Sequence, residues 1–250
     1  MLKAVLLDLD NTMVLFDEMT FYNRYFEKLC RCFGDILPAD AFTDLVLRST
    51  ISLGENNGDM SNRRFFLKTF MKDRREPAAH IWKRFMAFYE TTYDEIAVEV
   101  SVPEGLNDVL DRLQKRAFKL VLASNPIYPR VALEKRMAWA GIATHRFQLV
   151  THIENMSFVK PRPGYYRQVC EMIDTPPERC LMVGNDPVND MAAASAGLKT
   201  FLTTDVGAVD YSSLQLTVAE NVQRPTVPEP DFTGPFADVI KAVEDLKPET

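Results

Sequence analysis

The chain has 250 residues, 46% hydrophobic and 26% charged, with a formal net charge of -6 at pH 7. These proportions exclude an intrinsically disordered chain, and the acidic balance argues against non-specific nucleic-acid binding, which needs clustered Lys and Arg. No apolar run approaches the roughly 20 residues that span a bilayer, and the N-terminus lacks a signal-peptide pattern, so we expect a cytoplasmic protein without membrane partners. Its four cysteines fit reduced thiols of that compartment.

Five short apolar runs predict β-strands. Each is almost continuously apolar, as expected for strands buried on both faces. Between them lie helical patterns, two of which end at Gly141 and Gly197, where glycine suits the C-cap. Strands alternating with helices predict an α/β fold with a doubly wound, Rossmann-like parallel sheet. The strands are expected at residues 3–9, 119–124, 147–152, 180–185 and 199–204, and the helices at 104–117, 130–141 and 190–197.

One long interval, residues 16–98, breaks this alternation. It contains no convincing strand, only amphipathic segments rich in Phe, Tyr and Met. We interpret it as a second, smaller all-helical domain whose aromatic side chains form its core, inserted into an α/β core made of residues 1–15 and 99–250. Near the end of the chain, residues 223–235 are a Pro-rich connector not expected to form regular structure, followed by a short amphipathic helix.

Polar residues collect where the predicted strands end. In an open parallel sheet, ligands bind at the carboxyl ends of the strands. Acids at two strand ends with a lysine between them form a site where Mg²⁺, which prefers one or two carboxylates, can lie against a phosphate. Such a site would explain why a buried apolar run ends in two carboxylates that repel each other. The residues are Asp8, Asp10 and Thr12 after the first strand, Ser124 and Asn125 after the second, Lys160 beyond the third, and Asn185, Asp186 and Asp190 after the fourth.

The same segments resemble the four motifs of the haloacid dehalogenase superfamily, most of whose members are phosphatases. They read "DLDNT", "ASN", "KPRP" and "VGNDPVND", in that order, within residues 1–13 and 100–205. The resemblance implies that the helical insertion is the small cap that covers the active site. It also implies a Mg²⁺-dependent hydrolase that acts on a small phosphorylated metabolite.

The resemblance further implies a role for each motif residue. Asp8 would be the nucleophile that forms an aspartyl-phosphate, and Asp10 the general acid and then the base. Ser124 would orient a phosphoryl oxygen and Lys160 would supply positive charge, both as catalytic residues. Thr12 and Asn125 would bind substrate. The metal would be held by Asp8, the backbone carbonyl of Asp10, and the acids of the fourth motif, Asp186 and Asp190, of which Asp190 would act through a water or hold Lys160.

Three alternatives stay open. Gly184 is followed by Asn185 rather than by an acid, so either Asn185 or the favoured Asp186 occupies the metal position, unless Asp186 only caps a helix starting near Pro187. A metal-independent 2-haloacid dehalogenase would suit Tyr166 and the "SN" pair, but Asp10 argues against it. The chain could also be a non-catalytic member of the fold. The identity of the metabolite and the oligomeric state are not predicted.

Overall fold

The computed structural model describes residues 1–207 and 228–246. Within them, six strands form one sheet in the order β3-β2-β1-β4-β5-β6, and every neighbouring pair is parallel. The predicted parallel sheet is therefore confirmed, with strands shorter than the apolar runs. None of the helices formed by these residues is both long and apolar enough to cross a lipid bilayer. The strands are β1 Ala4–Leu7, β2 Lys119–Leu122, β3 Leu149–Val150, β4 Cys180–Gly184, β5 Lys199–Thr203 and β6 Phe232–Gly234.

The last strand, β6, corrects the prediction that residues 223–235 are irregular. It pairs with β5 at the edge of the sheet, with Pro235 directly after it. Proline cannot donate to a sheet ladder, but an edge strand of three residues tolerates it at the boundary. Asp231 anchors the strand, because its carboxylate accepts from the Lys199 ammonium at 2.7 Å and from the Thr200 N–H at 3.0 Å. Residues 223–227 of the predicted connector lie outside the described residues.

Successive side chains of the strands point to opposite faces of the sheet, as the pleat requires. Val5 and Leu7 join one buried apolar cluster, and Ala4 and Leu6 join another. Because helices supply the partners on both faces, the doubly wound arrangement is confirmed. The first face is covered by α5 (Leu106–Lys115), α6 (Arg130–Trp139) and α8 (Val239–Asp245), and the second by α7 (Pro163–Met172) and the 3₁₀ helix Met191–Ala196.

Two of the predicted helices end at glycines, as expected. Gly141 follows α6 with φ of 68°, and Gly197 caps the 3₁₀ helix with φ of 95°. Both values lie in the left-handed region, which glycine adopts without steric cost. The segment 190–197 differs from the prediction only in its helix type, which is 3₁₀.

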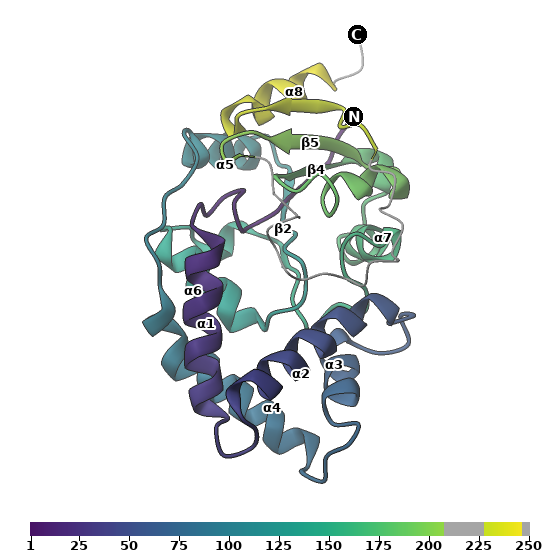
Figure 1. Cartoon of the computed structure of the whole chain (residues 1–250). Helices are drawn as coiled ribbons and strands as arrows, with labels where there is room; N and C mark the ends of the chain where they lie inside the picture. The colour runs from purple at the N-terminus through teal and green to yellow at the C-terminus, as the bar shows by residue number, and fades with distance from the viewer. Residues whose placement is uncertain (208–227, 247–250) are drawn as a thin grey trace.

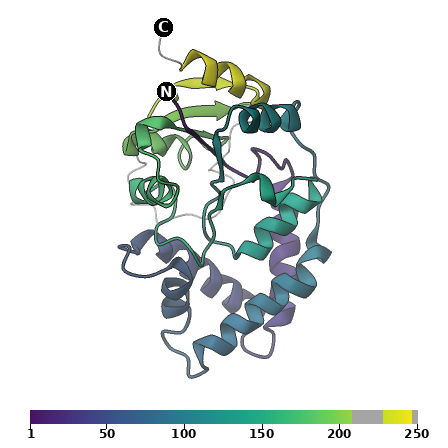
Figure 2. The ribbon, with the colours of Figure 1, turned by 180° about the vertical axis from the view of Figure 1, so that it is seen from behind.

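Residues 16–98 contain helices and no strand, as predicted. Asp17 caps the first helix, since its carboxylate accepts from the Thr20 N–H at 2.7 Å. The helices α2, α3 and α4 lie at the end of the molecule away from β5 and α8 (Figures 1 and 2). Phe33 packs on Phe42 with ring centroids 4.7 Å apart, so aromatic residues form the core here, as expected. The helices are α1 Glu18–Cys32, α2 Ala39–Ile51, α3 Asn62–Phe70 and α4 Ala78–Ala87, continued by the π-helical turn Phe88–Thr92.

This aromatic core is continuous with the core on the first face of the sheet. Tyr25 of α1 lies 6.0 Å from the ring of Tyr128, and Tyr93 stacks on Trp139 of α6 at 5.5 Å. One apolar cluster thus runs through both parts of the chain. The division into a helical domain at 16–98 and an α/β core therefore stays a proposal.

Candidate active site

Two neighbouring strands, β1 and β4, place the first and fourth motifs side by side. The chain leaves β1 toward β2 and leaves β4 toward β5, so the connections run in opposite directions from this pair. Such a topological switch point is where open α/β sheets bind ligands. Asp8 follows β1, and Asn185 follows β4, so both lie at this point.

Lys160 connects two buried carboxylates at this position. Its ammonium donates to Oδ1 of Asp8 at 2.8 Å and to Oδ1 of Asp190 at 2.5 Å. Burial raises the pKa of Asp8, and raises that of Asp190 to about 7, against the lowering effect of Lys160. Burial also disfavours the charged lysine, but the two carboxylates outweigh it and raise the Lys160 pKa. The lysine is therefore protonated at neutral pH and holds both acids.

Gly184, the last residue of β4, allows this arrangement. A Cβ atom at this position would lie 2.0 Å from Oδ2 of Asp190, a distance that no side chain can accept. The same Oδ2 accepts the Asp186 N–H at 3.0 Å. Asp190 is thus pressed against the backbone at the end of β4, which explains the glycine in the fourth motif.

Thr12 links the ends of the two strands. Its buried hydroxyl lies 3.3 Å from Oδ2 of Asp8 and 3.1 Å from Oδ1 of Asn185, and accepts the Asn185 N–H at 3.1 Å. Because the hydroxyl carries one proton, it donates to one of these two oxygens at a time. The structure therefore gives Thr12 internal partners at the site, and its role in substrate binding stays a prediction.

The two candidates for the metal position in the fourth motif have different surroundings. The Asn185 side chain contacts Thr12, whereas the Asp186 carboxylate accepts N–H groups of Val188 and Asn189, each at 2.8 Å. Asp186 thus caps a turn rather than a helix starting near Pro187, because the next helix begins at Met191. Its negative charge still lies close enough to contribute to the raised pKa of Asp8. Asp186, not Asn185, therefore brings negative charge to Asp8.

The second motif lies on the other side of Asp8, at the end of β2. Ser124 is buried, and its carbonyl accepts from the hydroxyls of Thr151 at 2.7 Å and Tyr165 at 3.0 Å. The Asn125 carbonyl oxygen Oδ1 accepts the Lys160 N–H at 3.2 Å. Asn125 therefore ties the loop that carries Lys160 to the end of β2, a contact that its predicted role in substrate binding did not include.

Arg136 on α6 is a site residue that the sequence reasoning missed. Its Nη1 forms an ion pair with Oδ2 of Asp10, and its guanidinium lies 4.4 Å from the ring centroid of Tyr128. Burial raises the pKa of Asp10, although the charge of Arg136 lowers it. The sequence does contain a signal for this residue. Arg136 lies between Leu133 and Met137 on the apolar face of a helix, and a charge buried there needs a partner of opposite charge.

The acids do not form a preformed metal cage. Within residues 1–207 and 228–246, no three or more His, Cys, Asp or Glu side chains are arranged to hold a metal ion. Asp190, expected among the metal ligands, has one oxygen on Lys160 and the other on a backbone N–H. The carboxylates of Asp8 and Asp186 also accept hydrogen bonds on both oxygens, so a bound cation would share or displace these donors. By residue type, two carboxylates with backbone oxygens fit Mg²⁺, which takes one or two carboxylates and completes its shell with water and phosphate oxygens.

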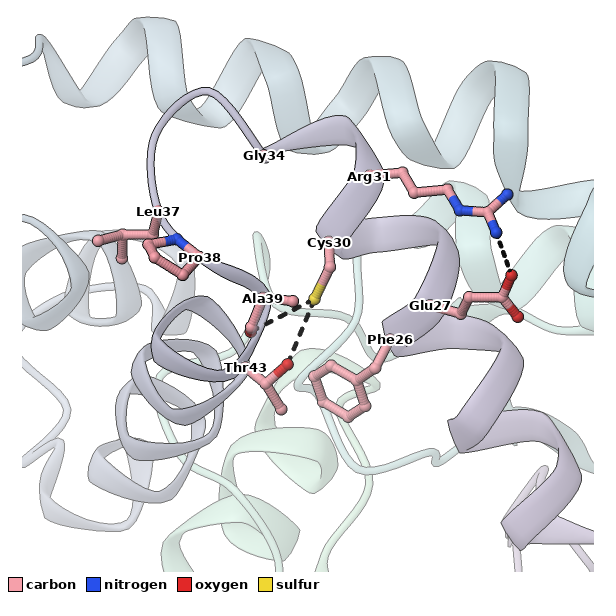
Figure 3. Close-up of a pocket in the computed structure, with 9 residues that line it drawn as sticks. All are labelled: Phe26, Glu27, Cys30, Arg31, Gly34, Leu37, Pro38, Ala39 and Thr43. Atoms are coloured by element: carbon pink, nitrogen blue, oxygen red, sulfur yellow. Dashed lines mark hydrogen bonds and ion pairs between the residues drawn. The ribbon is translucent and has the colours of Figure 1, made fainter.

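A separate hollow lies between α1 and α2, away from the strand ends (Figure 3). It has a volume of about 460 Å³ and a mainly apolar lining that includes Phe26, Leu37 and Pro38. Its cysteine, Cys30, lies with Sγ 3.3 Å from the Thr43 hydroxyl. No residue of the four motifs lines it, so the chemistry is expected at the strand ends.

Three comparisons place the chain among known proteins. A family model described as a haloacid dehalogenase-like hydrolase matches residues 2–197. PpaX of Caldanaerobacter subterraneus subsp. tengcongensis is 26% identical over 134 residues, which are 54% of this chain and 57% of that protein. The pyrophosphatase PpaX of Bacillus thuringiensis is 23% identical over 132 residues, which are 53% of this chain and 58% of that protein. The chain thus spans 57% and 58% of the length of these relatives.

Two solved structures share the fold over nearly the whole chain. The 2-haloacid dehalogenase from Pseudomonas syringae pv. Tomato superimposes with a TM-score of 0.63 at 14% identity, covering 99% of this chain and 100% of that one. A predicted phosphoglycolate phosphatase from Haemophilus somnus superimposes with a TM-score of 0.56 at 16% identity, covering 97% and 98%. Because identities this low carry information about fold alone, the chemistry has to be argued from the site.

Proposed function

Because the chain belongs to the haloacid dehalogenase-like hydrolases, we propose that it is a Mg²⁺-dependent phosphomonoesterase that acts on a small phosphorylated metabolite. The observation that carries this proposal is the pairing of Asp8 with Lys160 at the switch point of the sheet, with Asp10 two residues further on. The name of the relative PpaX, a pyrophosphatase, agrees with phosphate chemistry.

In this mechanism Asp8 attacks the phosphorus atom, and the bond to the leaving oxygen breaks. Asp10 gives its proton to that oxygen, so the leaving group departs as a neutral alcohol. Asp10 then takes a proton from a water molecule, whose oxygen attacks the phosphorus of the aspartyl-phosphate and releases Asp8 and inorganic phosphate. Lys160 orients Asp8 and offsets its charge, and the hydroxyl of Ser124 donates to a phosphoryl oxygen.

The charge at the site explains why a cation is needed. Lys160 contacts both Asp8 and Asp190, the charge of Asp186 also acts on Asp8, and the substrate adds a dianion. Each pair of like unit charges at ~4 Å costs about 4 kcal/mol at an effective dielectric constant of ~20. The carboxylates of Asp8 and Asp186 and the backbone carbonyl of Asp10 would hold Mg²⁺, which when bound offsets this repulsion and polarises the phosphoryl group.

Removal of divalent metal tests the proposed function. We expect EDTA to abolish the hydrolysis of p-nitrophenyl phosphate, measured by released nitrophenolate, and excess Mg²⁺ to restore it, because the repulsion between Asp8 and the phosphate is then offset again. A panel of phosphorylated metabolites, read by phosphate release, then identifies the substrate. Full activity in EDTA, together with halide release from a 2-haloacid, would refute the proposal in favour of a dehalogenase.

A pair of variants tests which residue of the fourth motif holds the metal. We expect Asp186→Asn to raise the Mg²⁺ concentration for half-maximal activity by about 10-fold or more, because Asn keeps the turn contacts but removes the charge. Asn185→Ala is the matched control and should shift this concentration far less. If the Mg²⁺ titration is unchanged in Asp186→Asn, Asp186 only caps the turn and does not hold the metal. If Asn185→Asp binds Mg²⁺ more tightly than the wild type, the metal position belongs to Asn185.

A further inference from the structure

Arg136 is a buried charge whose position core packing does not explain. The side chain has no exposed surface, and its guanidinium lies over the rings of Tyr128 and Phe21, at 4.4 and 5.7 Å from their centroids. Nε and Nη2 have no hydrogen-bond partner within the described residues. A buried arginine with two unsatisfied donors is costly, and replacing a whole buried ion pair by apolar residues of similar volume is often neutral or stabilising.

Its single ion pair within the described part of the chain is with Asp10. Nη1 contacts Oδ2 of that carboxylate, while Oδ1 is buried and finds no hydrogen-bond partner among residues 1–207 and 228–246. The two oxygens of Asp10 therefore differ: one is fixed by the arginine, and the other is unpaired beside the nucleophile Asp8. Because the aromatic rings confine the guanidinium, the fixed oxygen also fixes the orientation of the carboxyl group.

We infer that Arg136 is a positioning residue that holds Asp10 by Oδ2, so that Oδ1 is the oxygen that moves the proton. This inference rests on the proposed function. When the phosphorus–oxygen bond breaks, the proton on Oδ1 passes to the leaving oxygen, and Asp10 becomes a carboxylate paired with Arg136. In the second step Oδ1 takes a proton from water as the water oxygen bonds to phosphorus and the bond to Asp8 breaks.

Leaving groups of different basicity separate this role from a merely structural one. Benzyl phosphate needs a proton on its leaving alcohol, whereas p-nitrophenolate leaves without one. We expect Arg136→Met to lower kcat/KM for benzyl phosphate by about 10²-fold, within the range that general acid catalysis contributes, and for p-nitrophenyl phosphate by less than about 10-fold. Arg136→Lys, whose ammonium can still contact Oδ2, should recover part of the loss. The control is Arg130→Met on the same helix, an exposed residue paired with Glu134, which should change neither value.

A double variant checks that the effect passes through Asp10. Asp10→Asn should show the same selective loss, and Arg136→Met should add little in that background, because the carboxyl group that it positions is gone. Equal losses on both substrates, or an additive loss in the double variant, would overturn the inference. If Arg136→Met does not fold, the same comparison with Arg136→Lys decides it. A wild-type protein that hydrolyses neither phosphate would instead remove the proposed function, and the inference with it.

Discussion

We expect Asp8→Asn to lower kcat/KM for p-nitrophenyl phosphate by on the order of 10⁴-fold, to the background of the assay. Asparagine has almost the shape of aspartate, but its amide cannot form the aspartyl-phosphate of the proposed mechanism. The fold should persist, because the amide oxygen can still accept from Lys160, which also keeps Asp190, and the amide N–H can donate to the Thr12 hydroxyl. Rates from purified protein, with circular dichroism and thermal melting alongside, provide the measurement.

Asp111→Asn is the matched control for the loss of a carboxylate. Asp111 lies on α5 and forms an exposed ion pair with Arg146, so its replacement should leave the rate unchanged. Near-normal activity of Asp8→Asn would remove Asp8 from the nucleophile position. Loss of the cooperative melting transition in that variant would instead show that Asp8 has a mainly structural role.

The second large effect concerns stability at the same site. We expect Lys160→Met to lower the free energy of unfolding by about 3–5 kcal/mol and to abolish hydrolysis, because Asp8 and Asp190 are left buried and repel each other without a cation. Only 4% of Lys160 and 1% of Asp190 is exposed, so water cannot screen that charge. Denaturant unfolding followed by fluorescence measures the change.

Two further variants identify the cause of this loss. Asp190→Asn combined with Lys160→Met should recover part of the lost stability, since one of the uncompensated charges is removed. Lys199→Met breaks the more exposed pair with Asp231 and should cost less than about 1 kcal/mol. Equal effects of Lys160→Met and Lys199→Met would contradict the buried-pair explanation.

The parallel α/β sheet and its motif-bearing ends could be predicted from the sequence because their signals are local. A continuous apolar run marks a strand buried on both faces, and its carboxyl end marks where a polar side chain emerges. For this reason the five predicted strands were found, and Asp8, Lys160 and Asp190, placed at one site by their motifs, do meet. The helical character of residues 16–98 followed from periodicity in the same way.

Other features depended on contacts between distant segments, which no local pattern encodes. Arg136 meets Asp10 across 126 positions because α6 packs on the sheet face that also carries the aromatic core of α1. Gly184 is required by the position of Asp190, and β6 exists because β5 offers an open edge to a short segment with prolines beside it. The sequence therefore determined which chemical groups reach the ends of the strands. Only the tertiary structure decided which residues these groups contact, because those contacts depend on packing between elements whose own sequences do not specify it.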